Sequence, residues 1–325
     1  MVVEQRRPVH SRYHRKRHRV LLRPIIPGDS PKSPRKFAGI FFSTRRYNKI
    51  MNAPDLRPSP IAGTWYPSHP KKLETSLDEF FAAAALPELT GQVVAVIAPH
   101  AGHRYSGAVA AHAFAPLRGL TPDLVAVVSP YHNYDPRPLL TTQHRAYATP
   151  LGALEVDAES LAELQSRLPI PIAPIANDRE HSLEIELPFL QRVFSHAFKL
   201  LPIMIRAQEE SVARQLGEAL AQTLQNKNAI LVASTDLSHF HDQQTANIFD
   251  REMLRRFASL EPETIFQAEH TGKGFACGHA AVAAVEWAAL RLGATQARIL
   301  KYATSGDVTG DYASVVGYGA AVVTK

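Results

Sequence analysis

The chain has 325 residues, of which 45% are hydrophobic, as is usual for a soluble globular protein with a substantial core. No segment approaches the roughly 18 uninterrupted apolar residues that a membrane helix needs, which argues against a membrane protein. The single cysteine, Cys277, cannot form an internal disulfide, and the N-terminus has no apolar signal-peptide core. We therefore expect a cytoplasmic protein.

The net charge of +6 comes from one segment. Residues 1–50 contain 14 Lys and Arg against 2 Asp and Glu, whereas the rest contains 22 against 28. The body shows no basic stripe, so nucleic acid is not an expected partner. Residues 1–52 are predicted to be a disordered basic tail, because they offer too little apolar surface to fold. The tail is either a targeting or nucleic-acid arm or lies upstream of a true start at Met51, which we favour.

Residues 53–325 are predicted to form one domain. Apolar runs of strand length occupy residues 93–98, 124–129, 229–234, 298–303 and 313–323. Helical patterns lie at residues 106–117, 157–168, 180–195, 209–225 and 278–292. Buried strands that alternate with amphipathic helices predict an α/β fold, a layered α/β/α domain with a central sheet.

Three of the predicted strands end in polar clusters. The clusters contain His100 and His103 after the first strand, His132 and Asn133 after the second, and Asp236 and His239 after the third. Ligands of open α/β sheets bind at the carboxyl ends of the strands, so the clusters can converge on one site. A histidine that follows a strand is by itself more often a hydrogen-bonded turn residue, and only their convergence favours a site.

Two further clusters offer ligand atoms. Cys277 precedes a predicted helix, whose dipole would lower the pKa of the thiol and favour the metal-binding thiolate. The alternative for Cys277 is a small buried hydrophobe. A helix over 180–195 would place Glu184 on one face with Glu180 and His181, and the alternative is a solvated helix face. None of these clusters matches a compact metal motif such as HExxH.

Together these clusters resemble the Memo family, also called AmmeMemoRadiSam system protein B. The resemblance covers residues 57–323 and is carried by Ala62–Tyr66, Ala98–Gly102, Tyr105–Gly107, Pro130–His132, Thr149–Gly152, Glu180–Glu184, Ser234–His239, Cys277–Gly278 and Ser305–Asp307. The family's fold resembles that of the class III extradiol dioxygenases, so the resemblance implies this LigB-like fold here. In microbes it also implies a radical SAM protein and an AMMECR-type protein as partners.

The resemblance implies that His100, His132 and Cys277 bind a metal and that Asp236 and His239 line the same pocket. We predict that His239 and Asp236 are the catalytic groups, because a positioned base near the metal can move protons. Fe(II) is the expected ion, with copper or zinc as alternatives. The residues assigned to the substrate or to the surroundings of the metal are His181, Glu184, His103 and Asn133. The sequence departs from animal members at Asn133, at His103 and at Glu186.

Three functions are compatible with such a site. We predict a metal-dependent oxidoreductase that acts on an unknown substrate, because three protein ligands leave open positions on the metal. Cys277 in place of a carboxylate ligand speaks against ring-cleaving dioxygenase activity. The alternatives are a non-catalytic module that binds a peptide or small molecule, and a zinc hydrolase.

Overall fold

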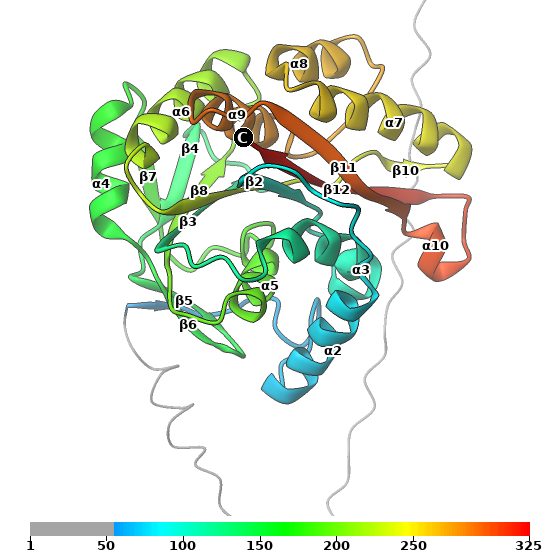
Figure 1. The fold of residues 1–325 in the computed structure, drawn as a ribbon, viewed down its shortest axis with the longest axis horizontal. Coiled ribbons are helices and arrows are strands. Elements are labelled where there is room, and N and C mark those ends of the chain that lie inside the picture. The colour runs from blue at the N-terminus through cyan, green and yellow to red at the C-terminus, as the bar shows by residue number, and fades with distance from the viewer. Residues whose placement is uncertain (1–54) are drawn as a thin grey trace, which may run out of the picture. The chain divides into compact units, whose positions relative to one another are not determined.

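The computed structural model describes residues 55–325, which form two sheets flanked by helices (Figure 1). The predicted tail, residues 1–52, lies outside the described residues. The larger sheet contains β2 (Val93–Ala98), β3 (Leu124–Pro130), β4 (Leu139–Thr142), β7 (Ile172–Ile175), β8 (Lys199–Ile205), β9 (Ala229–Ser234), β10 (His239–His241), β11 (Gln296–Thr304) and β12 (Val315–Thr324). Its strand order is β10-β12-β2-β9-β3-β8-β4-β7, and β11 pairs with β12.

Four parallel strands, β2, β9, β3 and β8, form the middle of this sheet. They are flanked by antiparallel β12 and β4. Every residue of β3 is buried, as expected for a parallel strand that is covered on both faces. Ala98 at the end of β2 is in register with Ser234 at the end of β9. The predicted strand ends therefore meet at one edge of the sheet.

Helices cover both faces of the sheet (Figure 1). One face carries α4 (Ala158–Arg167), α6 (Glu210–Leu224), α7 (Gln243–Ser259), α8 (Pro262–His270) and α9 (His279–Arg291), and the other carries α2 (Pro70–Ala83), α3 (His103–Phe114) and α5 (Leu187–Val193). Successive residues of β3 alternate between the two cores: Ala126 belongs to the first and Val127 to the second. This confirms the predicted α/β class, while the likeness to extradiol dioxygenases remains a prediction.

A smaller sheet joins β1 (Leu56–Arg57), β5 (Ala146–Thr149) and β6 (Gly152–Glu155). β1 pairs in parallel with β5, and β5 pairs antiparallel with β6. Both residues of β1 are buried, including Arg57. This short strand thus carries a charged side chain into the interior.

The predicted helix over 180–195 is wrong in its first half. A turn leads into the 3-10 helix η2 (Glu184–Glu186), and α5 follows. The side chain of Glu180 accepts the backbone N–H groups of His181 and Ser182, which competes with a helical hydrogen-bond pattern. Pro188, near the start of α5, is tolerated in the first turn of a helix but not in its interior.

Helices α2, α7 and α8 were not predicted from the sequence, whereas the helix predicted over 157–168 is present as α4, with Asp157 as its N-cap. Among the described helices, none combines the length and apolarity needed to cross a bilayer.

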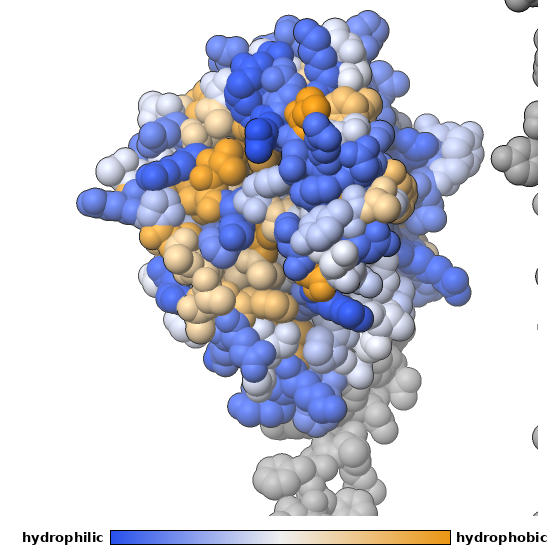
Figure 2. All heavy atoms as spheres, turned by 90° about the vertical axis from the view of Figure 1, so that its right-hand side faces the viewer, coloured by the Kyte–Doolittle hydropathy of each residue, from blue (hydrophilic) through white to orange (hydrophobic). Residues whose placement is uncertain are grey.

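The face that carries β10 and α10 (Gly306–Thr309) is largely hydrophilic, with scattered apolar patches (Figure 2).

Candidate metal centre

His100 is buried directly after β2, and its backbone N–H and both ring nitrogens have partners. Its backbone N–H donates to Asp236 Oδ1 at 2.8 Å, which ties the end of β2 to the segment after β9. Its Nδ1 lies 2.9 Å from Ser234 Oγ, and its Nε2 lies 3.1 Å from Cys277 Sγ. Burial, with smaller contributions from His132 and His181, lowers the pKa of His100 well below its ordinary value. The ring is therefore neutral at pH 7, the form that binds metals.

His132 and His181 share one carboxylate, that of Glu180. Glu180 Oε1 lies 2.9 Å from His132 Nδ1 and 3.2 Å from His181 Nδ1. Burial would raise the pKa of Glu180, but the hydrogen bond and charge of His132 outweigh burial and lower it. The ionised carboxylate accepts a hydrogen bond from His132 Nδ1 and leaves Nε2 of His132 free, as carboxylates do behind metal-binding histidines. The same oxygen accepts the backbone N–H of His181 and lies close to its Nδ1.

The three imidazoles meet at the carboxyl edge of the sheet. The rings of His132 and His181 are stacked at a centroid distance of 4.8 Å, and the ring of His100 stands nearly perpendicular at 5.2 and 5.5 Å from them. One donor nitrogen from each ring lies within 4.8 Å of the other two. Within residues 55–325 this set does not include Cys277, although its sulfur contacts His100. Burial lowers the pKa of His181 to about 4, so this ring is also neutral at pH 7.

Cys277 lies at the start of α9, where Gly278 lets the helix approach β9. A Cβ at Gly278 would lie 2.3 Å from the carbonyl oxygen of Ser234. The backbone N–H of Asp236 donates to Cys277 Sγ at 3.3 Å, and the N–H of Cys277 donates to the carbonyl of Asp236 at 3.2 Å. Helix, strand end and thiol are thus fixed together.

The prediction that the helix dipole lowers the pKa of the Cys277 thiol is wrong. Burial, and then the charge of Asp236, raises the pKa of Cys277 above its ordinary value. A cation at His100 would favour the thiolate, because a coordinated thiol loses its proton. Burial also raises the pKa of Asp236 to about 7, against the hydrogen bond from His100 N–H.

His239 lies in a cavity of about 440 Å³ that Cys277 also lines. The other lining residues are Gln208, Leu237, His241, Glu269, Phe275, Ala276 and His279. The Nδ1–H of His239 donates to the carbonyl of Leu237 at 2.7 Å, which leaves its Nε2 free. Burial lowers the pKa of His239. The cavity can therefore hold a small molecule between a neutral imidazole and the thiol.

Glu184, His103 and Asn133 make contacts other than with the three imidazoles. Glu184 is buried and accepts hydrogen bonds from Arg57, Ser59 and Tyr66. The Nε2 of His103 lies 3.4 Å from the carbonyl of Ile185, and burial lowers its pKa to about 4. Asn133 is exposed, and its carbonyl accepts a hydrogen bond from Arg206.

Arg57 anchors the segment that carries Glu180 and His181, a role the sequence analysis missed. It pairs with Glu184 Oε2 at 2.5 Å and with Asp178 Oδ1 at 2.7 Å. It also donates to the carbonyl of Glu180 at 2.8 Å. No sequence motif indicates a contact between residues more than 120 positions apart. Ser234, which holds His100, was noted in the sequence only as part of a strand end.

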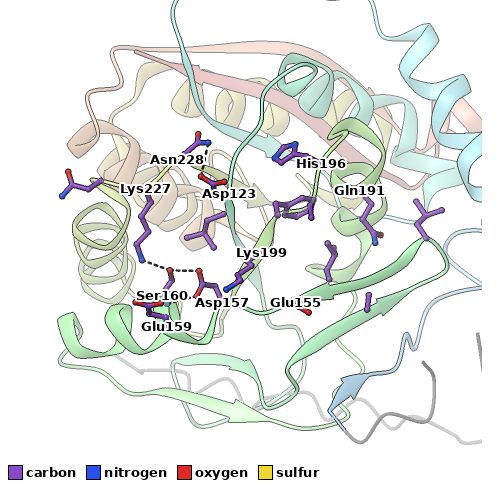
Figure 3. A pocket seen from close by; sticks show the side chains of 17 residues that line it. Asp123, Glu155, Asp157, Glu159, Ser160, Gln191, His196, Lys199, Lys227 and Asn228 are labelled. Atoms are coloured by element: carbon purple, nitrogen blue, oxygen red, sulfur yellow. Dashed lines mark hydrogen bonds between the residues drawn. The ribbon is translucent and has the colours of Figure 1, made fainter. Parts of the chain in front are cut away.

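A larger cavity of about 970 Å³ lies at the opposite, amino-terminal edge of the sheet (Figure 3). Its lining includes Asp123, Lys199 and Asn228, which lie where β3, β8 and β9 begin. Lys227 donates to Ser160 at 2.7 Å, and Ser160 donates to Asp157 at 3.1 Å (Figure 3). These polar groups are bound to one another, whereas free imidazole nitrogens converge at the carboxyl edge. We therefore place the candidate site at the carboxyl edge.

Comparison with known proteins identifies the family. A family profile described as Memo-like protein matches residues 57–322. The MEMO1 family protein of Nitrosopumilus maritimus is 34% identical over 270 residues, which cover 82% of this chain and 98% of that protein. The MEMO1 family proteins of Methanopyrus kandleri and Methanosarcina mazei are 34% and 33% identical over 82% and 83% of this chain and 98% and 99% of their own lengths. The chain belongs to the Memo family.

Proposed function

We propose that this protein is a metal-dependent oxidoreductase whose ion is held by His100, His132 and Cys277. The observation that carries the proposal is the way the two imidazoles are held. Ser234 and Glu180 engage their Nδ1 atoms, and Nε2 of His100 lies 3.1 Å from Cys277 Sγ. Oriented imidazoles beside a thiol form a donor set that fits a transition metal.

Fe(II) is the ion we propose first, because the family resemblance implies it. Copper and zinc are the alternatives, because imidazole also accepts them and the sulfur of Cys277 shifts the preference towards softer ions. Iron or copper would supply electron-transfer chemistry at the site. Three protein ligands leave coordination positions open, as in catalytic sites.

The protein's own residues would bind the substrate and move protons. The cavity of about 440 Å³ presents the free Nε2 of His239 to a small molecule. The pKa of Asp236, near 7, suits a group that holds or releases a proton beside His100 at neutral pH. We assign His239 and Asp236 these catalytic roles. His181 and Glu184 support the metal surroundings in the proposal, Glu184 through its ion pair with Arg57.

The family resemblance extends the proposal in three directions. It supports a fold like that of the class III extradiol dioxygenases and a cytoplasmic location. It also supports radical SAM and AMMECR-type proteins as partners in the same system.

Metal analysis of anaerobically purified protein tests the binding step. We expect stoichiometric iron or copper in the unchanged protein and in His69→Ala, a control at an exposed histidine. His100→Ala and His132→Ala should lose the metal. Stoichiometric metal in both of these variants would contradict the proposed site.

Oxygen uptake with a reductant and catechol-like substrates tests catalysis. Turnover by the metal-loaded protein that disappears in His132→Ala supports an oxidoreductase. A loaded protein that binds these compounds without turnover would instead support a non-catalytic binding module.

A further inference from the structure

We infer that His181 is a metal ligand, which completes an all-imidazole set with His100 and His132. This set is an alternative to the set of His100, His132 and Cys277. The two sets differ only in the third ligand. The inference rests on the proposed metal site and adds a donor to it.

The positions of the donor atoms are the first support. One nitrogen from each of the three rings lies within 4.8 Å of the other two, whereas Cys277 is outside this set. Metal–imidazole bonds of about 2.0–2.1 Å allow three donor nitrogens on one ion to be up to about 3.6 Å from one another. A shift of each nitrogen by less than about 1 Å therefore brings the three imidazoles into bonding reach of one ion.

The shared carboxylate is the second support. Glu180 Oε1 faces Nδ1 of His132 at 2.9 Å and Nδ1 of His181 at 3.2 Å. The hydrogen bond leaves Nε2 of His132 free, and the ring of His181 lies close to the same carboxylate oxygen. A carboxylate on the far nitrogen is the usual companion of a metal-bound histidine, and here one carboxylate accompanies two. If His181 had only a structural role, its Nδ1 would not need to face the same carboxylate as the Nδ1 of His132.

The third support is that the ring of His181 is held in place. It is stacked on His132 with an interplanar angle of 15°, and its centroid lies 4.2 Å from that of Trp65. Its segment is fixed because Arg57 donates to the carbonyl of Glu180 and pairs with buried Asp178. Rigid support of this kind is what a ligand needs in order to bind without a large loss of conformational freedom.

Two overlapping ligand sets have a chemical consequence. The thiolate of Cys277 favours soft ions such as Cu(I) and Zn(II), whereas three imidazoles suit Cu(II), Ni(II) and Co(II). The site can therefore accept ions of different softness by changing its third donor.

Titration with Co(II), followed by absorption spectroscopy, tests this inference. Cys277→Ser should still bind Co(II), but without a thiolate-to-cobalt charge-transfer band. His181→Ala or His181→Gln added to Cys277→Ser should weaken Co(II) binding by more than about 100-fold, because losing a ligand costs more than losing its hydrogen-bonding partner. His69→Ala added to Cys277→Ser is the matched control and should change nothing.

The outcomes separate this inference from the proposed function. Equal Co(II) affinity in Cys277→Ser with and without a substitution at His181 would overturn the inference, as would loss of Co(II) from Cys277→Ser alone. Both results leave the set of His100, His132 and Cys277 intact. Unchanged Co(II) binding in His100→Ala would overturn the inference and the proposed function together.

Discussion

Glu180 is the residue that organises the candidate site. One oxygen of its carboxylate faces the Nδ1 atoms of two histidines, and both oxygens accept backbone N–H groups from the same segments. A carboxylate that accepts the Nδ1–H of an imidazole makes Nε2 a better electron donor to a cation. The carboxylate thus fixes the direction and the donor strength of His132, and it holds the backbone of His181 beside it.

Glu180→Gln should weaken metal binding by about 10- to 100-fold, because the amide keeps the shape of the side chain but removes the charge. Competition with a chromophoric chelator measures this change. Glu79→Gln, at an exposed position on α2, is the control and should bind as the unchanged protein does. Equal affinity in Glu180→Gln and the control would show that the carboxylate does not support the site.

The sequence predicted the strand-end histidines but not their support. His100, His132 and Asp236 could be predicted because each follows an apolar run of strand length. The contact of the Glu180 carboxylate with the two histidines could not be predicted. It depends on a turn, whereas the spacing of apolar residues over 180–195 indicated a helix. The pKa of Cys277 was predicted in the wrong direction because burial, which no local pattern reveals, outweighs the helix dipole.

At the scale of elements, β1 is tied to the site segment by a buried ion pair. Arg57→Met should lower the free energy of unfolding by about 3–5 kcal/mol, because Asp178 and Glu184 would be left buried without their partner. Chemical denaturation measures the loss. Arg192→Met, which removes a comparable but exposed pair with Asp78, should cost less than about 1 kcal/mol. Similar losses in the two variants would contradict this account.

Glu286, in helix α9, makes the stability of the fold depend on pH. Both of its carboxylate oxygens are buried and lack a hydrogen-bond partner among the described residues. Burial raises the pKa of Glu286 well above 4.5. The folded state therefore keeps a proton that the unfolded state loses, so stability decreases as pH rises above 4.5 towards the raised pKa.

Glu286→Gln should reduce the pH dependence of unfolding by up to about 1.4 kcal/mol per pH unit in that window. Denaturation from pH 5 to 8 measures the slope, with Glu79→Gln as control. An unchanged slope in Glu286→Gln would show that the carboxyl group ionises in the folded protein as it does in water.

The elements themselves were predicted unevenly. The strands over 93–98 and 229–234 have the predicted bounds because their burial on both faces makes them continuous apolar runs. α7 was missed although Asp242 caps it, since its polar residues obscure the apolar periodicity. The helix predicted around Glu180 does not form because the side chain of Glu180 accepts hydrogen bonds from the local backbone.

At the scale of the whole molecule, the sheet collects residues that are distant in sequence. His100 follows β2, His132 follows β3 and Cys277 precedes α9; the strand order β2-β9-β3 places β9 between the first two strands, and α9 packs against β9. The sequence indicated that the strand ends share an edge, but not this order, because strand pairing depends on packing across the complete core. The larger cavity lies at the amino-terminal edge of the sheet, whereas the imidazoles follow the carboxyl ends of the strands.

Anomalous X-ray scattering from anaerobically grown crystals, collected at the iron, copper and zinc edges, is the most direct test of the metal centre. The account predicts one peak within about 2.0–2.3 Å of a ring nitrogen of both His100 and His132. A metal-loaded crystal whose anomalous peak is bound by neither histidine would contradict it.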